Sequence, residues 1–170
     1  RKLLQKKYKV RVTILKFTKK ASPEFAVNLM LLDKDVITTI QFANDIILNK
    51  NEIIIDAIFG YGLNRKTSGE FAKTIDGINN AKAKILSIDI PSGLFADDNR
   101  QNNGSIIRAD ITYTFECVKF SFLLESNLPF FGQVKLIDIN LDKQFLQSLK
   151  TKNHLLTNDS LPPIKNRPKT

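Results

Sequence analysis

Histidine and cysteine are nearly absent from this sequence, and their scarcity limits the active sites that it can form. One histidine, His154, and one cysteine, Cys117, occur among its 170 residues. A single cysteine cannot form an internal disulfide, and the two residues together are too few for a structural zinc site. A serine hydrolase is disfavoured as well, because position 90 is isoleucine where a nucleophile elbow around Ser92 needs glycine. Any metal should therefore be a hard cation that binds oxygen atoms.

Long apolar runs are missing too. No run approaches the roughly 18 residues of a membrane-spanning helix, and the N-terminal segment is cationic without the pattern of a signal peptide. Apolar residues make up 42% of the sequence, which is enough for one substantial core. The lone cysteine fits a reducing compartment. These features predict a soluble, cytoplasmic protein without a membrane partner.

The net charge of +9 comes from the two ends of the sequence. Residues 1–20 contain nine lysines and arginines and no acidic residue, and residues 150–170 contain five basic residues and one acidic residue. Residues 21–149 therefore carry a net negative charge. Nucleic-acid binding typically shows a basic patch along one face, so we expect no nucleic-acid partner.

Strands and helices alternate along the sequence. Apolar, β-branched segments predict strands at residues 9–16, 37–41, 52–58, 84–89, 110–115 and 132–138. Helical patterns occur at residues 22–33, 69–80 and 142–149. The alternation predicts an α/β fold with a mostly parallel sheet and helices on both of its faces. We expect one domain over residues 1–149 and a proline-containing linker over residues 150–170.

The stretch IIIDAIFGYGLNR, residues 53–65, contains a predicted buried strand, a carboxylate and a glycine-rich turn. In a Rossmann fold such a turn would bind the phosphates of a dinucleotide. That fingerprint requires a third glycine where this sequence has Arg65. The glycine motif alone therefore does not establish dinucleotide binding.

A second apolar strand also ends in a carboxylate. In ILSIDIPSGL, residues 85–94, Asp89 precedes a tight Ile-Pro-Ser-Gly turn that contains Ser92. Neighbouring parallel strands would bring Asp89 and Asp56 to one crevice at the carboxyl ends of the sheet, where open α/β folds bind ligands. The alternative interpretation is that both acids only cap turns.

Two residues after the predicted strand at 110–115 also have alternative interpretations. Cys117 is predicted to be a buried structural cysteine rather than a nucleophile, because no histidine lies near it in the sequence. Lys119 interrupts an apolar run, and it either reaches a phosphate or is solvated.

Four segments, in this order, resemble the NAD(P)H-hydrate epimerase family, the YjeF N-terminal domain. They are DAIFGYGLNR, SIDIPSGL, ADITYTFECVKFSF and FFGQVKLIDINL, and the similarity spans roughly residues 8–145. The resemblance implies a Rossmann-like three-layer α/β/α sandwich. It also implies an isomerase that interconverts the S and R forms of hydrated NADH and NADPH (NADHX and NADPHX) in nicotinamide nucleotide repair.

The resemblance implies roles for individual residues. Asp56 and Ser92 would be ligands of a potassium ion. Asp89 would bind the reacting end of the substrate and serve as the catalytic residue. Further contacts to NADHX or NADPHX would come from the glycine-rich turn, that is Gly60, Tyr61, Gly62, Leu63, Asn64, Arg65 and Lys66.

The sequence departs from the family in one respect. Members carry an Asn-Gly-Gly-Asp-Gly loop that would bind phosphate and supply a potassium ligand, and no such run occurs here. Because the sequence starts within a predicted helix end, we expect this loop upstream of Arg1 and expect this fragment alone to be inactive. The tail resembles the connector to the dehydratase domain of bifunctional bacterial members. A covalently linked dehydratase domain and a homo-oligomer are therefore partner hypotheses. The alternative function is a non-catalytic Rossmann-like module that binds a nucleotide or a protein.

Overall fold

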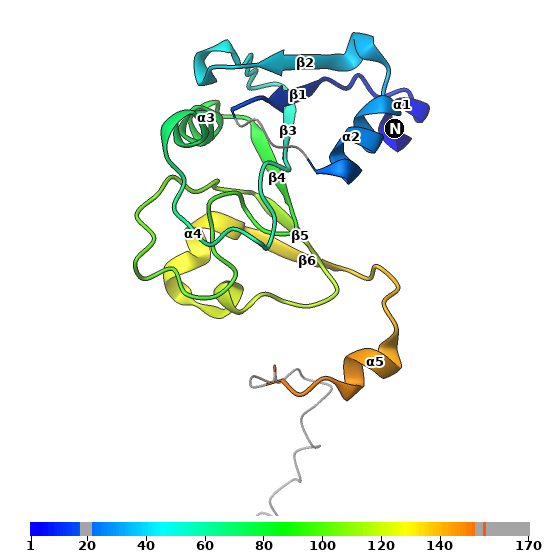
Figure 1. Ribbon diagram of the computed structural model, residues 1–170. Helices are drawn as coiled ribbons and strands as arrows, with labels where there is room; N and C mark the ends of the chain where they lie inside the picture. Colours follow the sequence, from blue (N-terminus) through cyan, green and yellow to red (C-terminus); the bar gives the residue numbers. More distant parts are fainter. Residues whose placement is uncertain (18–21, 152–154, 156–170) are drawn as a thin grey trace, which may run out of the picture. The chain divides into compact units, whose positions relative to one another are not determined.

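The computed structural model describes residues 1–17, 22–151 and 155 (Figure 1). By its internal contacts the chain divides into two units, Arg1–Ile139 and Asn140–Thr170, and each is described by itself. The predicted linker over residues 150–170 lies mostly outside the described residues, as does His154.

In the part of the chain that the structure describes, all strand pairs are parallel, and they form two sheets. In the first sheet, β1 (Val12–Leu15) pairs with β2 (Ile37–Ile40). The second sheet has the order β3-β4-β5-β6, with β3 (Ile53–Asp56), β4 (Lys84–Ile88), β5 (Ile111–Phe115) and β6 (Gln133–Ile137). The six predicted strands and the α/β class with parallel pairing are confirmed. The expectation of one continuous sheet is not met, because among the described residues β1 pairs with β2 alone and β3 with β4 alone.

The α-helices also follow the sequence pattern. They are α1 (Lys2–Gln5), α2 (Pro23–Met30), α3 (Gly69–Asn80), α4 (Leu128–Phe131) and α5 (Lys143–Ser148). Helix α2 begins as its sequence predicts, since the Ser22 Oγ accepts a hydrogen bond from the Phe25 N–H at 3.1 Å and Pro23 is the first helical residue. The single turn of α4 was not predicted. None of the described helices is long and apolar enough to cross a membrane.

Two apolar clusters form the core of the first unit. One joins Ile75 and Ile78 of α3 to Ile85 of β4, and also contains Ile107 and Ala109. The other consists of Ile90, Leu94, Ala96, Ile106, Phe122 and Phe131. Ile90 and Leu94 flank the Pro-Ser-Gly turn and are each 1% exposed. That turn is therefore anchored in the core on both sides, which holds its polar atoms in place for the site described next.

Two contacts connect the first sheet to the rest of its unit. Arg11, just before β1, forms an ion pair with Glu52, just before β3, at 2.8 Å. Phe17, just after β1, packs edge-on against Phe71 of α3 with the ring centroids 5.0 Å apart. Side-chain contacts near both ends of β1 therefore join the first sheet to the segment before β3 and to α3.

Candidate functional site

The candidate site lies at the carboxyl ends of β3 and β4, which are neighbours in the second sheet. Asp56 is the last residue of β3, and Asp89 directly follows the last residue of β4. The two strands run parallel in a register that places Asp56 opposite Ser87. Both acids therefore lie at one end of the sheet, where the sequence predicted them.

Asp56 is 2% exposed and is surrounded by hydrogen-bond donors. Its Oδ1 accepts hydrogen bonds from the Ser92 Oγ at 2.5 Å and from the Ile58 N–H at 3.3 Å. Its Oδ2 accepts from the Ser87 Oγ and from the Ser92 N–H, both at 2.8 Å. Burial raises the pKa of Asp56 above its ordinary value, while the hydrogen bonds from Ser92, Ser87 and Ile58 act in the opposite direction. Asp56 is thus a buried polar centre that joins two strands to the turn after β4.

Ser92 connects this carboxylate to the glycine-rich turn. While its Oγ donates to Asp56, it accepts a hydrogen bond from the Phe59 N–H at 2.9 Å. The next residue, Gly93, has a φ of 99°, and a Cβ there would lie 2.3 Å from the Ser105 carbonyl oxygen. Only glycine fits this position, so the close approach of the turn after β4 to the loop at Ser105 depends on Gly93.

Asp89 binds the same glycine-rich turn two residues further on. Its Oδ2 accepts a hydrogen bond from the Tyr61 N–H at 3.1 Å, and its Oδ1 forms an ion pair with the Lys119 Nζ at 3.0 Å. Its φ of 70° is a left-handed conformation, which aspartate adopts more readily than most residues. Ser92 and Asp89 together fix the backbone of the turn at Phe59 and Tyr61.

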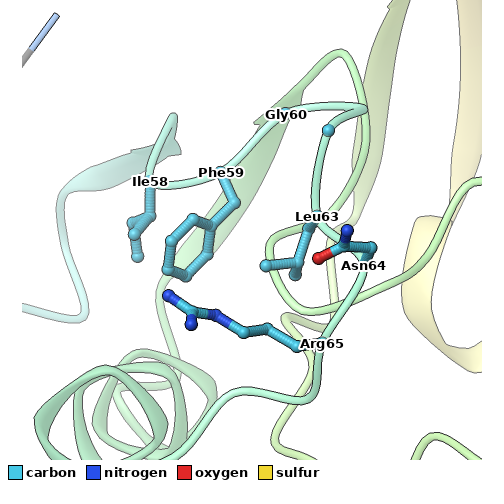
Figure 2. Close-up of a pocket in the computed structure, with 7 residues that line it drawn as sticks. Ile58, Phe59, Gly60, Leu63, Asn64 and Arg65 are labelled. Atoms are coloured by element: carbon cyan, nitrogen blue, oxygen red, sulfur yellow. The ribbon is translucent and has the colours of Figure 1, made fainter.

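The glycine-rich turn borders an open pocket of about 430 Å³ (Figure 2). The lining residues are Ile58, Phe59, Gly60, Gly62, Leu63, Asn64 and Arg65. In Figure 2 the Arg65 side chain extends back toward the ring of Phe59, which itself packs against Phe71 with the ring centroids 4.9 Å apart. A guanidinium group therefore lies along one wall of the pocket.

A second pocket, of about 380 Å³, shares part of the same turn. It is lined by Tyr61, Gly62, Leu63, Asn64, Phe95, Ala96, Asp97 and Asp98. Of the turn residues predicted to contact substrate, Lys66 lines neither pocket, and its Nζ donates to the Asn103 Oδ1 at 3.2 Å. The turn thus presents its residues to two adjoining hollows, with Lys66 directed to a neighbouring loop.

The two predicted potassium ligands are in direct contact with each other. Asp56 supplies carboxylate oxygens and Ser92 a hydroxyl oxygen, and the Phe59 carbonyl oxygen lies 3.5 Å from the Ser92 Oγ. Carboxylate, hydroxyl and carbonyl oxygens are the ligands that hard cations prefer. Within the described residues, no group of three or more His, Cys, Asp or Glu side chains could hold a metal. The residues present fit part of a potassium site, and other oxygen ligands would have to complete it.

Three residues of this region were missed or misjudged from the sequence. Ser87 donates to Asp56 and is 0% exposed, and its only signal was a hydroxyl within an otherwise apolar strand. Lys119 is 8% exposed and paired with Asp89, so the interpretation as a solvated lysine is wrong. The prediction that Cys117 is buried is also wrong. Cys117 is exposed, and it follows Glu116, which turns the chain with a φ of 58°.

Comparisons with known proteins agree with this architecture. The model of the family described as YjeF-related protein N-terminus matches residues 1–121. The NAD(P)H-hydrate epimerase of Oenococcus oeni is 31% identical over 141 residues, which cover 83% of this chain and 66% of that protein. The bifunctional NAD(P)H-hydrate repair enzyme Nnr of Thermofilum pendens is 33% identical over 119 residues, 70% of this chain and 22% of that protein. The NAD(P)H-hydrate epimerase of Lentilactobacillus buchneri is 40% identical over 93 residues, 55% of this chain and 43% of that protein. The chain therefore spans 66% or less of the length of these relatives.

Proposed function

The chain belongs to the family of YjeF-related protein N-termini, and from this membership we propose that it is an isomerase that interconverts the S and R forms of NADHX and NADPHX. Relatives named NAD(P)H-hydrate epimerase support the proposal. The observation that carries it is the placement of Asp89. Its carboxylate is bound to the backbone of a glycine-rich turn that borders an open pocket, at the carboxyl end of a parallel sheet.

The substrate would bind along the turn from Gly60 to Lys66. A Cβ added at Gly62 would meet no atom within 4 Å, so the backbone at this point is open to a ligand. Arg65 lines the larger pocket, and its guanidinium suits the bidentate binding of a phosphate group. Lys66 would add positive charge beside it. Either the pyrophosphate or the extra phosphate of NADPHX would match this pair.

Asp89 would act as the general acid-base catalyst of the reaction. Interconversion of the two hydrates requires that the configuration at C6 of the nicotinamide ring is lost and regained. This occurs either by opening of the C6–N1 bond or by loss and return of the hydroxyl group as water. Both routes move a proton onto or off an oxygen atom, which is the task of a general acid-base catalyst. The Asp89 carboxylate, fixed beside the turn, would accept that proton and return it.

Asp56 and Ser92 would hold the potassium ion. When bound, the ion would supply a positive charge that stabilises nearby anionic groups. In this chain the two side chains already touch, and Ser92 also binds the Phe59 N–H of the substrate turn. Occupation of the ion site would thereby stabilise the turn that receives the substrate.

The test of the proposed function is the rate of epimerisation of purified S or R hydrate by the full-length protein, corrected for the spontaneous reaction. Asp89→Asn keeps the shape of the side chain but removes its acid-base function. It should slow the reaction by about 10²-fold or more while substrate still binds. Asp76→Asn is the matched control, because Asp76 is an exposed carboxylate of α3. Activity of Asp89→Asn within a few-fold of wild type would assign the proton transfer to another group.

The potassium site is tested separately by thermal unfolding of the full-length protein. A ligand that binds the native state raises its stability in proportion to the logarithm of ligand concentration. The unfolding temperature should therefore be higher in potassium than in an organic cation at equal ionic strength, and Asp56→Ala should lose this difference. Equal unfolding temperatures of the wild-type protein in the two salts would contradict the site.

A covalently linked dehydratase domain is the remaining partner proposal. It is supported by relatives named bifunctional NAD(P)H-hydrate repair enzyme, of which this chain spans 22% and 20%. The test is the complete coding sequence of the protein. A reading frame that ends shortly after Thr170 would contradict the proposal.

A further inference from the structure

Lys119 is a buried lysine that has no role in the proposed reaction as described above. It is 8% exposed and follows β5, immediately before a short 3-10 helix (Phe120–Leu123). Lysine is almost never fully buried unless its ammonium group is paired. The local sequence therefore places a positive charge where it has to be neutralised by neighbouring groups.

Three oxygen atoms surround the Lys119 ammonium group. It donates hydrogen bonds to the Phe115 carbonyl oxygen at 3.0 Å and to the Cys117 carbonyl oxygen at 3.3 Å, and it pairs with the Asp89 Oδ1 at 3.0 Å. Two of these contacts are hydrogen bonds to backbone carbonyl oxygens and the third is an ion pair. The Lys119 ammonium group is therefore held by oxygen atoms of the protein.

Asp89 is held at three points, one on its backbone and two on its carboxylate. Its backbone N–H donates to the Tyr113 carbonyl oxygen of β5 at 2.7 Å, its Oδ1 meets Lys119, and its Oδ2 accepts from the Tyr61 N–H. The Asp89 side chain is 16% exposed, so the ion pair is poorly screened by water. Removal of one partner from such a pair leaves an uncompensated buried charge on the other.

We propose that Lys119 is a positioning residue for Asp89. It pairs with the Oδ1 of the carboxylate, so that the Oδ2 faces the Tyr61 N–H of the glycine-rich turn. This inference rests on the proposed function, in which Asp89 exchanges a proton with the substrate. It assigns Lys119 no contact with the substrate or its phosphates, because its ammonium group is buried and surrounded by oxygen atoms of the protein.

A double-mutant cycle in the full-length protein tests this role. Lys119→Met should lower kcat for epimerisation by about 10- to 10²-fold, the range expected when a catalytic group is misplaced by about 1 Å. KM should change less than kcat, since no side chain of the turn that binds substrate is altered. In the Asp89→Asn background, the same Lys119→Met change should have almost no further effect on kcat, because a residue that acts through Asp89 is silent once Asp89 is lost. Lys73→Met is the control, since Lys73 forms an exposed ion pair with Glu70 on α3.

The outcomes separate the two proposals. If the wild-type protein does not epimerise the hydrates, the proposed function fails. If it does, and Lys119→Met lowers kcat equally in the wild-type and Asp89→Asn backgrounds, or mainly raises KM, Lys119 acts on its own and the inference is overturned.

If Lys119→Met does not fold, NMR provides a test that does not require enzyme activity. A buried ammonium group with three acceptors exchanges its protons slowly, so the Lys119 NH₃⁺ signal should be visible by ¹⁵N-resolved NMR of the wild-type protein. That signal should shift or disappear in Asp89→Asn, as should the Tyr61 amide signal in Lys119→Gln. An ammonium signal that is unchanged by Asp89→Asn would also overturn the inference.

Discussion

The residues around Asp56 differ in how many hydrogen bonds depend on each of them. Ser87 Oγ donates to Asp56 alone, whereas Ser92 Oγ donates to Asp56 and also accepts from the Phe59 N–H. A hydrogen bond to a charged group contributes about 1.5–3 kcal/mol, and a buried N–H left without a partner costs about 1–3 kcal/mol. Ser92→Ala should therefore lower the free energy of unfolding more than Ser87→Ala. Urea unfolding of both variants measures the difference, and equal losses would contradict the double role of Ser92.

The ionisation of Asp56 gives a second prediction at the level of single residues. Burial raises the pKa of Asp56 from 3.8, so the folded state binds this proton more tightly than the unfolded state. The associated stability is fully present below pH 3.8 and is lost as the pH rises through the higher folded pKa. The Arg100 side chain, by contrast, lowers the pKa of Asp98 to about 2. Titration of the carboxyl carbons by ¹³C NMR in potassium-free buffer should place Asp56 above its ordinary value and Asp98 below it. A pKa of Asp56 below that of Asp98 would contradict this prediction.

Within the structural elements, the turn after β4 is the least tolerant of change. Gly93 has a φ of 99° and its Cβ would lie 2.3 Å from the Ser105 carbonyl oxygen, whereas the space around Gly62 is open. Gly93→Ala should therefore destabilise the protein by about 1–3 kcal/mol or more, from backbone strain together with the clash. Gly62→Ala is the matched control, and its unfolding free energy should stay within about 0.5 kcal/mol of wild type. Thermal unfolding of the two variants gives the comparison. If Gly93→Ala is as stable as wild type, the backbone at Ser105 can move to accommodate the added Cβ.

The sequence was most informative about elements whose signal is local. Apolar β-branched runs located β3 and β4, and the acids at their ends placed Asp56 and Asp89 at one edge of the sheet. The same reasoning placed Ser92 near Asp56, whereas their direct hydrogen bond was not predicted. Lys119 was misjudged because its partner, Asp89, lies 30 residues earlier in the sequence, and a lone lysine carries no sign of such a partner. The division into two sheets could not be predicted from the sequence either, because strand pairing is set by long-range contacts rather than by the sequence of each strand.

For the molecule as a whole, the first sheet is joined to the segment before β3 and to α3 by contacts of unequal strength. The Arg11–Glu52 pair is exposed, with side chains 35% and 48% accessible, so its contribution is about 0–1 kcal/mol. The packing of Phe17 on Phe71 adds an aromatic pair of about 0.5–1.5 kcal/mol beyond its buried area. Neither contact involves backbone pairing between β1 and β3. Among the described residues, the edge of β3 away from β4 therefore has no strand partner.

That edge combines free backbone groups with an apolar surface. Ile53 and Ile55 point to the same face of β3 and are 62% and 49% exposed, and among the described residues β3 pairs with β4 alone. A strand edge of this kind pairs readily with other chains unless charged residues or further structure protect it. Residues 1–170 should therefore self-associate in a concentration-dependent way.

Ile53→Lys combined with Ile55→Lys tests whether this edge is the cause. Lysine on an edge strand opposes pairing, so the double variant should remain monomeric at concentrations where the parent chain associates. Met30→Lys with Leu31→Lys is the matched control, because it adds the same charge at residues that are 84% and 50% exposed at the end of α2. Light scattering over a range of protein concentrations provides the measurement. If the parent chain is monomeric at every concentration measured, the β3 edge does not cause association and the prediction is wrong. If both double variants abolish association equally, net charge rather than the β3 edge controls it, since a general increase in positive charge suppresses association at any surface.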